Sequence, residues 1–363
     1  MNSHDVFCPN NDCPARGRCG EGNIRIHART PLRYRCTVCG KTFGARAGTL
    51  FYRRHTDEAT ITTVLTLLAH GCPLAAVVVA FGVRRQTVSA WLDAAGQHSG
   101  AVHQQLVLTP RDLGQVQADE LRVRRQGGAG ALWAGWMAMA MMVSTRLWLG
   151  GVVSPHRNGA LIRRLMLLVH AAALPGPILL CVDGFAAYVG AFLAITRTPA
   201  PATGRRGRPR LHPWAGVVVG QVVKQRVGYR VVAVTRRLVQ GTEAELARRL
   251  PQGQQIHTAY IERLNATFRA RLGTLTRRTR GLARRETRLH RGMYLLGTVY
   301  NFCTPHASLA RSQTPAMAAA ITDHVWSVGE LPHYPVPPQP WEPPKQRGRP
   351  SKETQRLIAR WCT

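Results

Sequence analysis

The chain has 363 residues, of which 45% are hydrophobic, and it carries 49 lysines and arginines against 18 aspartates and glutamates. This length is sufficient for one sizeable core and one or two small modules. A net charge of +31 repels itself in a folded chain, so we expect a polyanionic partner. Nucleic acid is favoured over an anionic membrane, because the basic residues are spread along the sequence and are not gathered on one amphipathic helix.

The apolar and cysteine patterns predict a cytoplasmic protein. Residues 1–11 are polar and contain no apolar signal-peptide region. The most apolar stretch, Ala131–Val153, is interrupted by Arg146, so it predicts buried strands and not a membrane span. Nine cysteines, four of them paired near the N-terminus, are typical of a metal site in a reducing compartment and not of a disulfide framework.

Two cysteine pairs predict a structural zinc site in the N-terminal segment. The pairs are Cys8 with Cys13 and Cys36 with Cys39. Two such pairs on tight turns can surround Zn²⁺ with four thiolates. The segment has almost no apolar core, so metal binding would supply its folding energy. The first pair is widely spaced, which leaves Cys19 as an alternative ligand, and a set of free cysteines is the plainer alternative.

Residues 56–98 predict helices in a helix-turn-helix arrangement. Thr56–Glu58 can begin a first helix, Leu74–Phe81 forms a second, and Gly82–Val83 makes a tight turn before a third. The outward residues of that third helix are candidates for DNA contacts, namely Arg84, Arg85, Gln86 and Ser89. An ordinary three-helix packing unit remains the alternative.

Acidic residues are scarce in the middle of the chain. Between Gly96 and Thr242 they are Asp112, Asp119, Glu120 and Asp183 alone. Asp119 follows a short predicted strand, and Asp183 ends the apolar run Ile178–Val182, as a carboxylate at the end of a central strand would. Glu120 should point to the opposite face from Asp119, either outward or paired with an arginine. Burying a charged carboxylate is unfavourable unless its charge is compensated, so we expect a specific role for an acid on a buried strand of so basic a segment.

Glu262 supplies a third candidate carboxylate. It lies in a predicted helix, and Asn265 and Arg269 share its face at spacings of three and seven residues. Three carboxylates on two strands and one helix can hold two Mg²⁺ or Mn²⁺ ions against a DNA phosphate. Each carboxylate taken alone could equally be a solvated or salt-bridged surface acid.

Several segments resemble bacterial insertion-sequence transposases of the DDE class that carry an N-terminal zinc ribbon and a helix-turn-helix. The matching segments are Arg33–Phe43, Ala118–Glu120, Val182–Tyr188, Ile261–Asn265 and Tyr300–His306. The resemblance implies an α/β, RNase H-like fold with Asp119, Asp183 and Glu262 as catalytic metal ligands. It also implies that Arg269 is a basic partner for DNA and that the protein is at least a homodimer. The chain departs from the pattern in its wide first cysteine pair and in a basic insert between Asp183 and Glu262.

Three basic segments are further candidates for DNA contact. Arg205–Arg210 and Gln346–Lys352 share an Arg-Gly-Arg-Pro core that resembles the AT-hook, although solvated linkers would have the same composition. Thr276–Arg285 is a denser run next to the predicted active-site helix, which favours phosphate binding. The individual candidates are Arg208, Arg277, Arg278 and Arg280.

The sequence therefore predicts four parts. They are a zinc ribbon (1–50), a helix-turn-helix domain (51–105), an RNase H-like domain (106–320) with a basic insert at 197–213, and a Pro-rich basic tail (321–363) that we expect to be extended or disordered beyond Leu331. The expected function is metal-dependent cleavage and joining of DNA at the ends of a mobile element. The alternatives are a non-catalytic DNA-binding regulator, a nuclease of the same fold, and a decayed copy that folds without activity.

Overall fold

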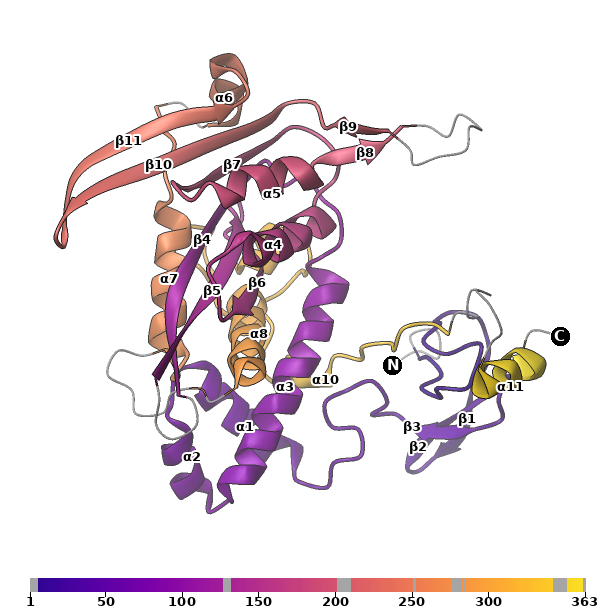
Figure 1. The fold of residues 1–363 in the computed structure, drawn as a ribbon. Coiled ribbons are helices and arrows are strands. Elements are labelled where there is room, and N and C mark those ends of the chain that lie inside the picture. The colour runs from indigo at the N-terminus through magenta and orange to yellow at the C-terminus, as the bar shows by residue number, and fades with distance from the viewer. Residues whose placement is uncertain are drawn as a thin grey trace. The chain divides into compact units, whose positions relative to one another are not determined.

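Figure 1 shows the computed structural model of the chain. It describes residues 6–126, 132–200, 210–250, 253–275, 283, 285–341 and 351–361. The chain divides into two compact units: Met1–Thr56 with Pro332–Thr363, and Asp57–Leu331. The segments predicted as helix-turn-helix and catalytic domain therefore lie in one unit. None of the described helices is long and apolar enough to cross a membrane.

A small antiparallel sheet organises the first unit. Its strands, in spatial order, are β1 (Ile24–Arg29), β2 (Leu32–Cys36) and β3 (Thr42–Gly44). The chain after Leu331 returns to this unit, where the Leu50 N–H donates to the Pro332 carbonyl at 2.9 Å and the Val336 N–H donates to the Gly48 carbonyl at 3.0 Å. The segment Pro332–Pro340 therefore belongs to the same unit as the small sheet. The sequence did not predict this contact.

The tail beyond Leu331 was predicted to be extended or disordered, and this is wrong at two places. The short helix α10 (Glu330–His333) overlaps the start of this segment, and α11 (Lys352–Trp361) forms its last described part. The Ser351 hydroxyl accepts a hydrogen bond from the Thr354 N–H at 3.1 Å, which caps the N-terminus of α11. The ten residues of α11 contain no Pro or Gly, so the prolines upstream do not disturb it.

The second unit begins with three helices, α1 (Glu58–Ala69), α2 (Leu74–Phe81) and α3 (Arg85–Leu106). The Asp57 carboxylate accepts from the Thr60 N–H at 2.8 Å and caps α1, and Gly82 makes the α2–α3 turn with a φ of 60°. These helices confirm the predicted positions. The helix α3 continues well past the predicted segment and packs along α8 (Glu286–Cys303). At Gly96 an added Cβ would lie 2.4 Å from the Arg291 carbonyl oxygen, so glycine permits this close approach.

A mixed six-stranded sheet forms the centre of the second unit. Its strands are β4 (Gln115–Gln126), β5 (Leu132–Met142), β6 (Trp148–Ser154), β7 (Ile178–Asp183), β10 (Val217–Val227) and β11 (Arg230–Gln240). Their spatial order is β11-β10-β7-β4-β5-β6. The strands β4, β7 and β10 are mutually parallel, whereas β5, β6 and β11 pair antiparallel with their neighbours. The predicted α/β class is thus confirmed.

Helices flank this sheet on both faces (Figure 1). They are α4 (Gly159–Ala172), α5 (Ala187–Ile195), α6 (Glu243–Arg249), α7 (Ala259–Arg271) and α8, and the short helix α9 (Pro315–Ala318) packs against α8. The side chains of β4 alternate between the faces: Gln117 and Asp119 contact the α7 side, and Glu120 contacts Tyr188 of α5. The sequence did not predict α5, because its residues are apolar on every side and so lack helical periodicity.

Two short strands, β8 (Arg197–Pro199) and β9 (Leu211–Pro213), bracket the predicted basic insert. They pair antiparallel with each other and form a sheet of their own. Residues 201–209, which include the AT-hook-like segment and Arg208, lie outside the described residues. The insert therefore leaves and rejoins the domain through a defined pair of strands.

Buried aromatic rings join α3, α7 and α8 to the sheet. The Trp148 ring centroid lies 4.8 Å from that of His103, 5.7 Å from that of Phe268 and 5.2 Å from that of Tyr294. His103 Nε2 is 3.1 Å from the Leu149 carbonyl oxygen. A histidine therefore stands in the packed core, between the predicted DNA-binding helices and the sheet.

We expect this histidine to make the second unit sensitive to acid. Burial lowers the pKa of His103 from 6.5 to about 4, so the folded protein keeps the ring neutral where the unfolded chain protonates it. The stability that depends on the neutral ring is present above pH 6.5 and is lost as the pH falls toward 4, by up to about 3 kcal/mol. The test is the free energy of unfolding, measured in urea at pH 7.5 and at pH 5. The difference between the two values should be about 2 kcal/mol smaller in His103→Gln than in the unsubstituted protein. His212→Gln, at an exposed position, is the control, and an unchanged difference in His103→Gln would contradict the assignment.

Candidate active site

Two carboxylates meet at the ends of neighbouring parallel strands. Asp119 lies in β4, and Asp183 is the last residue of β7. In the register of these strands Gln117 is the partner of Cys181, two residues before each aspartate. The aspartates therefore reach the same level of the sheet, and the carboxylate oxygens of Asp119, Glu120 and Asp183 lie within 4.8 Å of one another. The acidic group these residues form could bind a metal ion.

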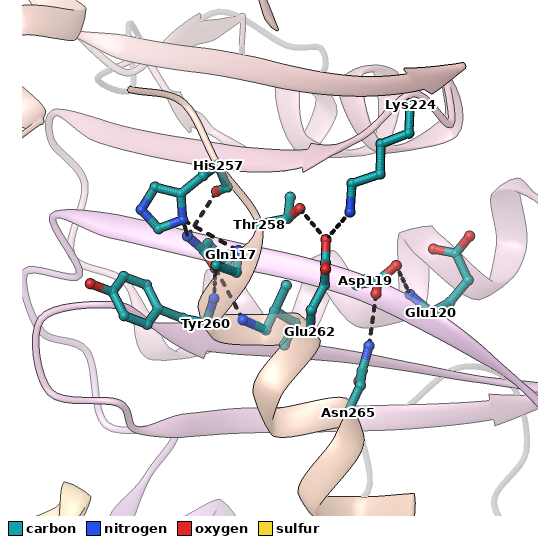
Figure 2. Close-up of polar contacts among 11 residues, drawn as sticks. Gln117, Asp119, Glu120, Lys224, His257, Thr258, Tyr260, Glu262 and Asn265 are labelled. Carbon is teal, nitrogen blue, oxygen red and sulfur yellow. Dashed lines mark hydrogen bonds and ion pairs between the residues drawn. The ribbon is translucent and has the colours of Figure 1, made fainter. Parts of the chain in front are cut away.

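Asp119 is the most buried of the three carboxylates predicted as metal ligands, Asp119, Asp183 and Glu262. Burial and the neighbouring charges of Glu120 and Asp183 raise its pKa to about 7. Its Oδ2 accepts a hydrogen bond from Asn265 Nδ2 at 2.8 Å, and its Oδ1 accepts one from the backbone N–H of Glu120 (Figure 2). These two donors fix the carboxylate but bring no positive charge. A cation at this position would therefore be stabilising.

Glu262 lies on α7 and lines the same cavity as Asp119 and Asp183. Its Oε1 accepts hydrogen bonds from Lys224 Nζ at 2.5 Å and from the Thr258 hydroxyl at 2.7 Å (Figure 2). Glu262 does not belong to the tight group of carboxylates, since its side chain is engaged with the lysine of β10. The sequence thus selected three carboxylates that share one cavity, but it did not indicate that Lys224 pairs with the third.

Gln117 fixes α7 against the sheet. Its Oε1 accepts from the backbone N–H groups of Tyr260 and Ile261, at 3.1 and 3.0 Å, and its Nε2 donates to the His257 carbonyl at 2.8 Å (Figure 2). A strand side chain thereby satisfies N–H groups that the first turn of a helix leaves unpaired. Because Gln117 fixes the first turn of α7, it also fixes the position of Glu262 relative to Asp119. Sequence reasoning missed this residue, and the only sequence signal for it is a polar side chain in the predicted strand, two residues before Asp119 and so on the same face.

Glu120 points to the other face of β4, as predicted, and it is paired with an arginine. The partner is Arg157, in the loop between β6 and α4, whose Nε and Nη2 both donate to Glu120 Oε1. The same Nη2 lies 3.2 Å from Asp183 Oδ2. Arg157 was not a sequence candidate, because nothing in the loop sequence indicates that it reaches the carboxylates.

The carboxylates open into a cavity of about 520 Å³. It is lined by Asp119, Arg157, Asp183, Gly184, Phe185, Ala186, Val222, Val223, Lys224, Thr258 and Glu262. All the anionic donors are carboxylate oxygens, the ligands that Mg²⁺ and Mn²⁺ prefer, and the volume leaves room for a substrate group and water beside the ions. The donor set and the uncompensated charge around Asp119 fit a divalent cation.

The four predicted zinc ligands are brought together in the first unit. The Sγ atoms of Cys8, Cys13, Cys36 and Cys39 lie within 4.8 Å of one another, and three of these side chains are buried. Burial raises the pKa of the Cys8 thiol and raises that of Cys13 to about 12, so a metal ion is needed to stabilise the thiolates there. Cys19 is exposed and lies outside the cluster. The cluster suits a structural Zn²⁺ ion.

The predicted DNA-binding residues differ in their surroundings. Arg84, Arg85 and Gln86 are exposed at the start of α3, whereas Ser89 is half-buried and its hydroxyl accepts a hydrogen bond from Arg288 at 3.1 Å. Ser89 is therefore directed toward α8 and not outward as predicted. Arg269 is half-buried on α7. Arg277, Arg278 and Arg280 lie outside the described residues, as does the Arg-Gly-Arg-Pro segment near residue 348.

No model of a protein family matches the chain, and comparison with curated proteins gives no match either.

Proposed function

We propose that this protein is a DDE-type DNA transposase, which cleaves DNA at the ends of a mobile element and joins the new 3′-hydroxyl to target DNA. One observation carries the proposal. Asp119 and Asp183 stand at the same level of neighbouring parallel strands, and Glu262 of α7 lines the same cavity. Three carboxylates in this arrangement are what a two-metal phosphoryl transfer requires.

The architecture supports the proposal. A mixed sheet flanked by helices, with two carboxylates on its strands and a third on a later helix, is the arrangement that an RNase H-like fold provides. Here the antiparallel strands β4, β5 and β6 are followed by α4, the parallel strand β7, α5 and the parallel strand β10. The third carboxylate follows on α7, after the antiparallel strand β11 and α6. We therefore assign the second unit to this fold.

The residues of the site have separate tasks in this mechanism. Asp119, Asp183 and Glu262 would hold the divalent cations, which when bound activate the attacking oxygen and stabilise the leaving oxygen. Asn265 orients Asp119 by its hydrogen bond to Oδ2, and Gln117 holds the helix that carries Glu262. Lys224 lines the same cavity and pairs with Oε1 of Glu262, so it would compete with a cation for that oxygen and would offer a positive charge to a DNA phosphate.

The remainder of the chain supports DNA as the partner. The net charge is +31, and Arg84, Arg85 and Gln86 are exposed at the start of α3, as the recognition helix of a helix-turn-helix requires. The cysteine cluster would hold a zinc ribbon beside it in the chain. Since transposition brings two DNA ends together, we expect a homodimer or a larger assembly.

Incubation with labelled DNA tests this function. The substrate is the DNA that flanks the coding sequence, with Mg²⁺ or Mn²⁺ present. We expect metal-dependent nicks that leave 3′-hydroxyl ends, and joined products of higher mass. DNA binding without nicks would instead identify a regulator, and nicks without joined products would identify a nuclease.

A further inference from the structure

Arg157 places a fixed positive charge beside the candidate metal ligands. Its guanidinium bridges two carboxylates, Glu120 and Asp183, and its side chain lines the cavity. We propose that Arg157 is a phosphate-binding residue of the active site, positioned by Glu120 and Tyr188, and this inference rests on the proposed function. In the absence of metal the same guanidinium balances the charge of Asp183.

Glu120 is the buried anchor of this arrangement. Its side chain is only 1% exposed. One carboxylate oxygen accepts from Arg157, and the other accepts from the Tyr188 hydroxyl at 2.6 Å. Both oxygens of Glu120 therefore have protein donors, and its carboxylate also lies close to Asp119 and Asp183. A buried carboxylate without a paired cation would be strongly destabilising, so Arg157 stays with it.

Two aromatic rings hold the guanidinium from other elements. Its central carbon lies 4.3 Å from the ring centroid of Phe185 and 5.3 Å from that of Trp136 on β5. The Phe185 N–H also donates to Asp183 Oδ1 at 2.9 Å, so the turn that carries the ring also orients the candidate ligand. Arginine stacks on aromatic faces while keeping its donors available in the plane. The position of the guanidinium is therefore set by the sheet and by the turn after β7.

One part of the guanidinium remains available to a substrate. Nε and Nη2 contact Glu120 and Asp183, and Nη1 has no hydrogen-bond partner among the residues that the structure describes. When a cation binds Asp183, Arg157 loses that contact and keeps Glu120. Nη2 keeps one N–H on Glu120, and its other N–H, which no longer contacts Asp183, forms with Nη1 a pair of donors of the kind that matches two oxygens of one phosphate.

A comparison of metal binding with catalysis tests this role. Mn²⁺ affinity is measured by calorimetry without DNA, and DNA nicking is measured at saturating Mn²⁺. Arg157→Gln should bind Mn²⁺ about tenfold more tightly, because a competing cation is removed, and should nick DNA about a hundredfold more slowly, because the phosphate loses its donors. Arg163→Gln makes the same charge change at an exposed position of α4 outside the cavity and should change neither value.

Asp183→Asn separates this inference from the proposed function, because it should weaken Mn²⁺ binding whatever the role of Arg157. If the unsubstituted protein shows no Mn²⁺ site that Asp183→Asn weakens, both proposals are overturned. If that site is present and Arg157→Gln changes neither Mn²⁺ affinity nor nicking, the role of Arg157 is overturned and the function stands. Should Arg157→Gln not fold, the double variant with Glu120→Gln removes both charges of the buried pair and gives the same comparison.

Discussion

Replacing Asp183 by asparagine is expected to lower the rate of DNA strand transfer by at least about a thousandfold, which corresponds to about 4 kcal/mol of transition-state stabilisation. The substitution keeps the size of the side chain and removes the charge that would hold a metal ion. Asp183 is 39% exposed at the end of β7, so we expect the protein to fold. DNA binding should be retained, because the basic surfaces are unchanged. A gel assay of joined products and a DNA-binding titration measure the two effects.

Asp112→Asn is the matched control for this prediction. It makes the same chemical change in the same strand-rich segment, at an exposed position outside the cavity where the side chain accepts a hydrogen bond from the Gly114 N–H. Asparagine can accept that hydrogen bond as well, so activity should be close to that of the unsubstituted protein. Strand transfer at full rate by Asp183→Asn would overturn the proposed mechanism.

Removing the zinc ligands is the second change with a large expected effect. Cys36→Ser should lower the zinc content from about one ion per chain to none and should unfold the ribbon. The buried core around the cysteines is small, so metal binding is the main source of stability; its members are Val6, Cys8, Cys13, Ala15, Ile24, Tyr34, Cys36, Phe43 and Ala47. Apparent zinc-binding free energies of roughly 10 kcal/mol or more exceed what such a core supplies. Elemental analysis and limited proteolysis of the N-terminal segment measure the result.

Cys19→Ser is the control for the zinc site. Cys19 is exposed and lies outside the cluster of four, so this variant should retain zinc and resist proteolysis like the unsubstituted protein. Loss of zinc in Cys19→Ser, or full retention in Cys36→Ser, would show that the ligand set is wrong.

Within the candidate site, the sequence could predict only those residues whose type is rare in the surrounding segment. Asp119 and Asp183 are carboxylates in a segment almost without acids, and the apolar run before Asp183 predicted its strand. Gln117, Arg157 and Lys224 could not be found in this way, because glutamine and basic residues are common in this chain and their roles depend on the strand pairing. Glu120 was predicted to point away from Asp119. Its partner Arg157 could not be predicted, because the contact depends on the position of the β6–α4 loop.

In the fold, too, the elements with local sequence signals were predicted, and those that depend on tertiary contacts were not. The four cysteines, the caps of α1 and the turn at Gly82 are local signals, and they were predicted. The length of α3 was not, because its residues beyond the predicted segment 56–98 pack against α8. The helix α5 lacks periodicity since it is apolar all round, and the contact of the segment after Leu331 with Gly48 and Leu50 spans most of the sequence.

That last contact has a consequence for synthesis. The segment with the four cysteines leaves the ribosome before the second unit, but the partners of Gly48 and Leu50 are Val336 and Pro332, which are made only after the whole second unit. While the second unit is translated, the nascent N-terminal segment therefore has its own small sheet, its local core and the cysteine cluster, without the contacts of the C-terminal segment. A chain that stops before Pro332 would carry all four cysteines and still leave the Gly48 carbonyl and the Leu50 N–H without their partners.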